Sequence, residues 1–202
     1  SLMNKQSSSF KYIDLFAGCG GLSLGLESAG GELIVAVERS PMAGETFFHN
    51  LINRVGSKSE WDEYVSSSLD KQFEAGLVVR ELGNLLSSKP LMRKLKAITP
   101  DLVVGGPPCQ GFSLARRRNR EDLRNQLPWQ FLEVVDNTSP KMVVIENVVG
   151  MRHKFDSEDG DVFQQLQRAL EQTGDGYVVQ AVEVNALHYG APQHRPRLML
   201  IA

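Results

Sequence analysis

Short runs of apolar residues alternate along the chain with longer stretches in which apolar positions recur every three or four residues. Runs of the first kind predict buried strands, and stretches of the second kind predict helices. The predicted strands cover residues 11–15, 33–37, 77–80, 102–104, 142–145, 177–184 and 197–201. The predicted helices cover residues 22–29, 41–51, 91–98, 129–138 and 162–172, with a helical excursion at 56–76. This alternation predicts an α/β fold with a doubly wound, mostly parallel, seven-stranded sheet, in which ligands bind at the carboxyl ends of the strands.

The composition agrees with one domain spanning residues 1–202, because the chain is 42% hydrophobic and 23% charged. No apolar run is long enough to cross a bilayer, so we expect no membrane contact. The two cysteines make no disulfide framework, and they and the four histidines show no metal-ligand spacing. A net charge of −2 does not by itself indicate a nucleic-acid partner, but five arginines gather between positions 116 and 124. This cluster fits either a solvated loop or a loop that contacts phosphates.

Cys109 follows the predicted strand 102–104 after two glycines and two prolines. An isolated cysteine is usually a small buried hydrophobe, but a residue of that kind needs no Gly-Gly-Pro-Pro segment before it. The prolines fix the backbone at the carboxyl end of the strand, and Gly111 allows a substrate to approach closely. The pattern therefore favours a nucleophile.

A glycine-rich turn with Gly18, Gly20 and Gly21 follows the first predicted strand and opens a helix, as in nucleotide-binding α/β folds. Ser23 stands where the dinucleotide fingerprint has Gly or Ala, which counts against a nicotinamide-dependent oxidoreductase. Glu38 ends the second predicted strand, where a carboxylate either accepts hydrogen bonds from a ribose diol or faces solvent. The glycine turn and Glu38 together predict a cofactor that contains adenosine.

Glu146 and Asn147 directly follow the apolar run 142–145, where a carboxylate is costly unless it is hydrogen-bonded or functional. Near a thiol nucleophile, Glu146 could hydrogen-bond or protonate a substrate ring nitrogen. The alternative is that Asn147 caps a helix and Glu146 merely ends the strand. Gln193, Arg195 and Arg197 alternate, so an extended strand would point all three to one face. The two guanidinium groups could hold an anionic or carbonyl group, or they could pair with neighbours on the surface.

Taken together, these segments resemble the cytosine carbon-5 DNA methyltransferases. Four segments are similar to motifs of that family, in the family's order: Asp-Leu-Phe-Ala-Gly-Cys-Gly-Gly at 14–21, Gly-Pro-Pro-Cys-Gln-Gly-Phe-Ser at 106–113, Glu-Asn-Val at 146–148 and Gln-His-Arg-Pro-Arg at 193–197. The resemblance implies the Rossmann-like fold of methyltransferases that use S-adenosylmethionine. It also implies methyl transfer to carbon 5 of a cytosine in double-stranded DNA, as in restriction-modification systems.

The resemblance further implies a role for individual residues. Cys109 would attack carbon 6 of a flipped-out cytosine, Glu146 would engage ring nitrogen 3 and the exocyclic amine, and Arg195 and Arg197 would complete the catalytic set. The residues implied to bind S-adenosylmethionine, with S-adenosylhomocysteine as product, are Asp14, Phe16, Gly18, Cys19, Gly20, Gly21, Glu38, Asn84 and Pro107. The residues implied to contact DNA are Gln110, Ser113, Arg116, Arg117, Arg118 and Gln193, with the segment from Arg116 acting as a mobile lid.

The family normally continues into a target-recognition domain and a last helical motif, and neither follows Ala202. We therefore expect a truncated catalytic domain, or one half of a split enzyme whose second part carries the recognition domain, with weak cofactor binding by this chain alone. Methylation of tRNA cytosines and a catalytically silent methyltransferase-like subunit remain alternatives, although Cys109, Glu146 and Arg195 together argue against the silent subunit. A prokaryotic protein of this kind is expected in the cytoplasm, with the nucleoid.

Overall fold

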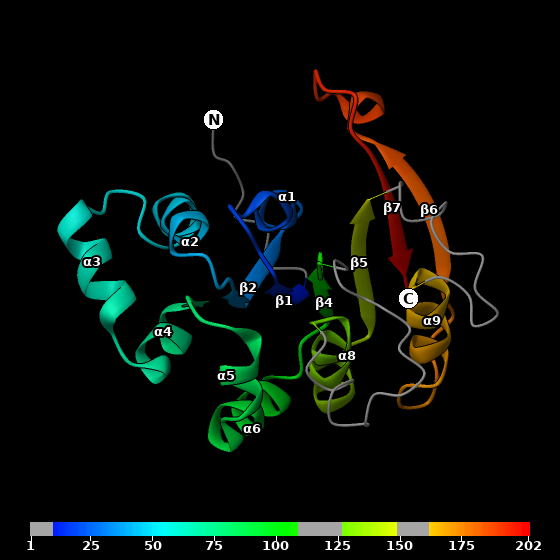
Figure 1. The fold of residues 1–202 in the computed structure, drawn as a ribbon, viewed down its shortest axis with the longest axis horizontal. Helices are drawn as coiled ribbons and strands as arrows, with labels where there is room; N and C mark the ends of the chain where they lie inside the picture. The colour runs from blue at the N-terminus through cyan, green and yellow to red at the C-terminus, as the bar shows by residue number, and fades with distance from the viewer. Residues whose placement is uncertain (1–9, 109–126, 149–161) are drawn as a thin grey trace.

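Each of the seven apolar runs forms a strand, and the strands join in one sheet in the order β3-β2-β1-β4-β5-β7-β6 (Figure 1). The structure, a computed structural model, describes residues 10–108, 127–148 and 162–202. Strands β1 to β5 run parallel, and β7 runs antiparallel to both β5 and β6. The predicted doubly wound, mostly parallel, seven-stranded sheet is confirmed. The strands are β1 (Phe10–Leu15), β2 (Gly31–Val37), β3 (Leu77–Val78), β4 (Leu102–Gly105), β5 (Met142–Val148), β6 (Gln180–Asn185) and β7 (Pro196–Ile201).

The predicted helices are present, and the excursion after β2 contains two of them, α3 and α4. N-terminal capping explains where two of these helices begin. At the start of α2, Ser40 precedes Pro41 and its side chain accepts from the backbone N–H of Ala43. At the start of α3, Ser57 and Glu60 form a capping box. The described helices are α1 (Gly21–Ser28), α2 (Pro41–Phe47) with a π-helical turn η1 (Phe48–Ile52), α3 (Lys58–Ser66), α4 (Leu69–Ala75), α5 (Leu82–Leu86), α6 (Lys89–Ile98), α8 (Leu127–Thr138), α9 (Val162–Glu171) and the 3₁₀ turn η3 (Ala186–Tyr189).

The two faces of the sheet bury different helices, because side chains alternate along each strand. Ile13 and Leu15 belong to a core that also contains apolar residues of α5, α6, α8 and α9. Tyr12 and Val104 point to the other face, where Leu22 and Leu26 of α1 pack on them. Figure 1 shows this arrangement, with α1 above the sheet and α5, α6, α8 and α9 below it. No helix among the described residues is long and apolar enough to cross a membrane.

Helix α5 has no counterpart among the predicted elements. Gly83 and Asn84 both disfavour a helix interior, so the sequence of this segment gives a weak local signal. Its Leu82 and Leu85 are buried, and α5 packs against α8. Tertiary packing therefore stabilises a turn of helix that propensity alone does not predict.

Gly105 ends β4 beside the carboxyl end of β1, and the two strands are in register at Leu15 and Gly105. A Cβ added to Gly105 would lie 2.1 Å from the carbonyl oxygen of Leu15. Only glycine fits this approach of two backbones. The contact fixes the start of the Gly106-Pro107-Pro108 turn next to the turn that follows β1.

Candidate active site

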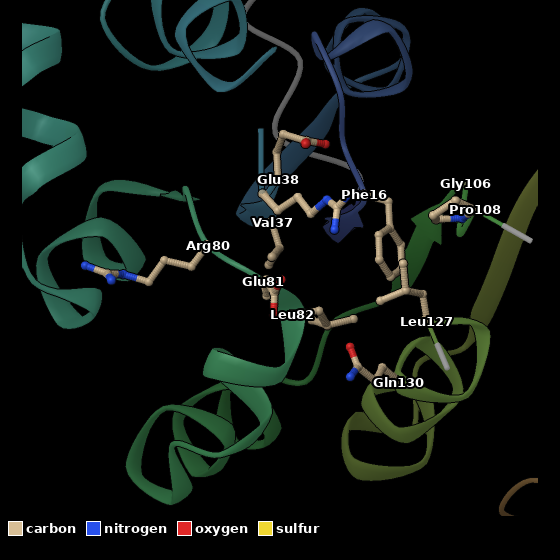
Figure 2. A pocket seen from close by; sticks show the side chains of 11 residues that line it. Phe16, Val37, Glu38, Arg80, Glu81, Leu82, Gly106, Pro108, Leu127 and Gln130 are labelled. Atoms are coloured by element: carbon tan, nitrogen blue, oxygen red, sulfur yellow. The ribbon is translucent and has the colours of Figure 1, made fainter. Parts of the chain in front are cut away.

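A cleft of about 590 Å³ opens at the carboxyl ends of the parallel strands, the edge where the sequence predicts ligand binding (Figure 2). Residues that directly follow β1, β2, β3 and β4 form its walls, and the start of α8 closes one side. The lining residues are Phe16, Val37, Glu38, Arg39, Arg80, Glu81, Leu82, Gly106, Pro108, Leu127 and Gln130.

The turn after β1 adopts a backbone that favours glycine. Phe16, Gly18 and Gly20 have φ angles of 59°, 57° and 90°, in the left-handed region. A Cβ on Gly20 would lie 2.6 Å from a methyl group of Leu51 and 2.8 Å from the ring of Phe47. The strained conformation of Phe16 places its side chain on the cleft wall, as expected of strain that is retained at a functional site.

Glu38 is held in place through both oxygens of its carboxylate. Oε2 accepts from the backbone N–H of Gly18 at 2.8 Å, and Oε1 accepts from the backbone N–H of Ser40 at 2.7 Å. Each oxygen keeps a further lone pair, so the half-buried carboxylate can accept from the two hydroxyls of a diol in the cleft. These contacts do not match a freely solvated carboxylate. The aromatic face of Phe16 and the fixed acceptor Glu38 fit the adenosine part of S-adenosylmethionine.

Asp14 lies on β1 and is completely buried. Its Oδ2 accepts from the hydroxyl of Ser23 in α1 at 2.6 Å, while Oδ1 has no hydrogen-bond partner within the described residues. Burial, with smaller contributions from the nearby carboxylates Glu146 and Glu38, raises the pKa of Asp14 to about 7, against the hydrogen bonds from Ser23, which lower it. Asp14 therefore ties α1 to β1 beneath the glycine turn, and it does not line the cleft itself.

Glu146 lies within β5, which continues to Val148, so the prediction that Glu146 and Asn147 follow the strand is wrong. The antiparallel partner β7 extends the ladder to the pair Val148 and Arg197, which keeps this segment in strand geometry. Asn147 is consequently a strand residue as well. The carboxylate of Glu146 accepts from Nε of Arg197 at 2.8 Å.

The same carboxylate lies beside the turn that leads to Cys109. A Cβ on Gly106 would be 4.0 Å from Oε2 of Glu146 and 3.6 Å from its carbonyl oxygen. The ends of β4 and β5 thus bring the paired Glu146 and Arg197 next to the Gly106-Pro107-Pro108 turn, in which Pro107 is buried between two cleft residues. Among the described residues, no group of acidic, histidine or cysteine side chains is arranged to hold a metal ion.

Gln193, Arg195 and Arg197 would point to one face only if all three lay in an extended strand, and of the three only Arg197 lies in one. Strand β7 begins at Pro196, and both Gln193 and Arg195 lie exposed in the connection before it. Oδ1 of Asn185 accepts from the backbone N–H of Arg195 at 3.1 Å and from that of Leu187 at 3.2 Å. These bonds shape the 3₁₀ turn η3 and the bend before β7, so Gln193 and Arg195 are not in strand geometry.

The remaining predicted site residues do not all lie at the cleft. Asn84 is exposed on α5 and does not line the cleft, whereas Glu81 and Leu82 do. Cys19 is exposed in the glycine turn, and Gly21 begins α1. Six predicted residues lie outside the described residues: Cys109, Gln110, Ser113, Arg116, Arg117 and Arg118.

Sequence reasoning missed four polar residues of the cleft, namely Arg39, Arg80, Glu81 and Gln130. Glu81 follows the end of β3, so the rule that identified Glu38 at the end of β2 could have found it as well. Gln130 lies one turn into α8, and no local pattern marks it.

Comparison with known proteins places this geometry among methyltransferases. Residues 10–202 match the family model described as C-5 cytosine-specific DNA methylase. The chain is 34% identical to the Type II methyltransferase M1.HphI of Haemophilus parahaemolyticus, over 96% of this chain and 45% of that protein. It is 31% identical to the Type II methyltransferase M.AquIA of Picosynechococcus, over 95% of this chain and 71% of that protein.

Solved structures show the same fold. A prophage-encoded protein of Escherichia coli, described as a DNA modification methyltransferase, superposes with a TM-score of 0.65 at 28% identity, over 96% of this chain and 46% of that one. The DNMT2 protein of Spodoptera frugiperda superposes with a TM-score of 0.64 at 20% identity, over 96% of this chain and 49% of that one, which is a likeness of fold alone. This chain spans less than half the length of M1.HphI and of both superposed chains.

Proposed function

Because this chain belongs to the C-5 cytosine-specific DNA methylase family, we propose that the protein containing it transfers a methyl group from S-adenosylmethionine to carbon 5 of cytosine in DNA. One observation carries the proposal: the paired carboxylate of Glu146 lies beside Gly106, in the turn that precedes Cys109 and that also lines the cleft. The turn that precedes Cys109, a polar group suited to a pyrimidine edge and the cleft proposed for the cofactor therefore meet at one edge of the sheet.

The cofactor would lie in the cleft between the strand ends. Glu38 would accept from the ribose hydroxyls, and Phe16 would pack on the adenine ring. Gly18, Gly20 and Gly21 keep the turn after β1 close to the cofactor, with Asp14, Cys19 and Pro107 in supporting positions. When bound, S-adenosylmethionine supplies an electrophilic methyl group.

The chain's own residues would perform the remaining chemistry. The Cys109 thiolate adds to carbon 6 of a cytosine turned out of the base stack, which leaves carbon 5 nucleophilic. Glu146, oriented by Arg197, hydrogen-bonds ring nitrogen 3 and the exocyclic amine, and so draws electron density away from carbon 6. Loss of the carbon 5 proton after methylation then expels the Cys109 thiolate and regenerates the nucleophile.

Contact with DNA would come from two segments that flank this site. Gln110, Ser113, Arg116, Arg117 and Arg118 follow the nucleophile, and cationic side chains there would neutralise phosphates. Gln193 and Arg195 are exposed before β7, where a bound duplex could reach them. Because this chain spans 45% of M1.HphI, we propose that a further segment or a second subunit supplies target recognition. A prokaryotic protein with this activity would act in the cytoplasm, with the DNA.

The experiment is product analysis with methyl-labelled S-adenosylmethionine and the full-length protein. Unmethylated genomic DNA and total tRNA are the two substrates, and each is digested to nucleosides after the reaction. The proposal predicts label in 5-methyl-2′-deoxycytidine from DNA, abolished by Glu146→Ala and retained by Glu63→Ala on the exposed face of α3. Label confined to tRNA, or found on a nitrogen of the base, would reject methylation of DNA carbon 5.

A further inference from the structure

Gln130 lines the cleft and carries an amide oxygen whose hydrogen-bonding capacity no described residue uses. It lies on α8, and its buried Oε1 has no hydrogen-bond partner in the part of the chain that the structure describes. The other atom of the amide, Nε2, faces α5, because a Cβ on Gly83 would lie 3.6 Å from it. A buried carbonyl oxygen that loses water and gains no donor destabilises the fold, so such an oxygen requires an explanation.

The neighbours of this oxygen cannot supply the donor. Figure 2 shows Gln130 at the end of the cleft opposite Glu38, below Phe16 and next to the apolar side chains of Leu82 and Leu127. Arg80 also lines the cleft, but its Nη2 donates to the carbonyl oxygen of Ser67 at 2.9 Å, and its guanidinium points away from Gln130 (Figure 2). No described residue therefore supplies the donor, and a ligand in the cleft is the source that fits this oxygen.

We propose that Gln130 determines specificity for the adenine base, with its Oε1 accepting a hydrogen bond from the exocyclic amine of the cofactor. The inference rests on the proposed function, since it assumes that S-adenosylmethionine occupies this cleft. A ribose held at Glu38 and a ring packed on Phe16 direct the base toward the Leu82, Leu127 and Gln130 end. An amide oxygen can only accept, so a purine with a carbonyl in place of the amine would leave two acceptors facing each other.

The test compares two probes that differ at that group, S-adenosylhomocysteine and S-inosylhomocysteine, by calorimetric titration of the full-length protein. Wild-type protein is expected to bind the adenosyl probe at least about tenfold more tightly than the inosyl probe. Gln130→Leu is expected to weaken binding of the adenosyl probe about tenfold and to change binding of the inosyl probe less than about twofold. Gln130→Glu restores an acceptor and is expected to keep the preference for adenosyl.

Two further readouts separate this role from a structural one. Gln130→Leu should raise the KM for S-adenosylmethionine and leave kcat unchanged, and its ligand-free melting temperature should not fall, because the change removes an unsatisfied buried oxygen. The control is Gln167→Leu, which removes an exposed bond to Glu171 on α9 and should bind both probes as wild type does. Equal weakening of both probes by Gln130→Leu, or no change in either, would overturn the inference while the cofactor site stands. Failure of wild-type protein to bind either probe would overturn the inference and the proposed cofactor together.

Discussion

Arg197 places its Nε 2.8 Å from Oε1 of Glu146, although 51 positions separate the two residues. Strands β5 and β7 make this contact possible, because Val148 pairs with Arg197 in their antiparallel register and Glu146 lies two residues away on the same face. The side chain of Glu146 is 26% exposed and that of Arg197 is 18% exposed, so solvent screens the ion pair only in part. Nη1 of Arg197 also donates to the carbonyl oxygen of Pro196 at 2.9 Å, which fixes the guanidinium.

Replacement of Arg197 should impair the chemical step. Arg197→Ala leaves Glu146 without its charged partner and free to turn from the substrate, so we expect single-turnover methyl transfer to slow about 100-fold. Cofactor affinity should change little, because Arg197 does not line the cleft. The control Arg54→Ala removes an exposed pair with Glu27 and should leave the rate unchanged. An Arg197→Ala enzyme with the wild-type rate would show that the pair has no part in catalysis.

Glu38 should matter for cofactor affinity. In Glu38→Gln the amide N–H₂ cannot accept, so it faces the backbone N–H of Gly18 or of Ser40 without a hydrogen bond. The substitution therefore disturbs the glycine turn and also removes one of the oxygens proposed to accept from the ribose hydroxyls. We expect the Kd for S-adenosylhomocysteine to rise about 10- to 100-fold, measured by titration. Glu63→Gln, on exposed α3, is the matched control. Unchanged affinity in Glu38→Gln would place the ribose elsewhere.

Asp14 should make stability fall as pH rises. The pKa of Asp14 is about 7 in the folded state against an ordinary value of 3.8, so between these values the folded protein holds a proton that the unfolded chain releases. The free energy of unfolding therefore declines by up to about 4 kcal/mol as the pH rises from 3.8 to about 7. Above pH 7 Asp14 is ionised in both states, so it causes no further change. Denaturation of the wild type and of Asp14→Asn at several pH values isolates the effect. If the difference between the two proteins were constant from pH 4 to 8, Asp14 would titrate normally.

Two glycine substitutions should have opposite effects on stability. Gly105→Ala forces a Cβ against the carbonyl oxygen of Leu15, and we expect it to reduce the free energy of unfolding by about 3 kcal/mol. Gly25→Ala lies in the exposed interior of α1 with no atom near the added Cβ, and should stabilise by about 0.5–1 kcal/mol. Urea denaturation measures both. A tolerated Gly105→Ala would mean that β1 and β4 separate more easily than their contact indicates.

The alternation of apolar runs and amphipathic stretches was enough to predict the sheet, because buried parallel strands carry a strong local signal in the sequence. Helix α5 could not be predicted, because its packing against α8, and not the helix propensity of its own residues, makes the segment helical. The extent of β5 was underestimated for a similar reason: pairing with β7 holds Glu146 in the strand, and a polar residue after an apolar run looks like the end of one.

The candidate site likewise contains residues that the sequence could predict and residues that it could not. Glu38 could be predicted because it ends a strand, and Phe16 because of the motif around it, and both line the cleft. The bend before β7 depends on the side chain of Asn185, ten residues before Arg195, so periodicity in the segment 193–197 could not reveal it. That Gln130 lines the cleft follows only from the packing of α8 against α5, which the local sequence does not show.

Covalent trapping tests the central claim most directly. The full-length protein is incubated with S-adenosylmethionine and a DNA duplex that carries 5-fluorocytosine at the methylated position, from which the carbon 5 fluorine cannot leave as a proton does. We expect a protein–DNA adduct that survives denaturation, disappears in Cys109→Ser and persists in Glu63→Ala, a change on the exposed face of α3. An adduct that persists in Cys109→Ser would contradict the account.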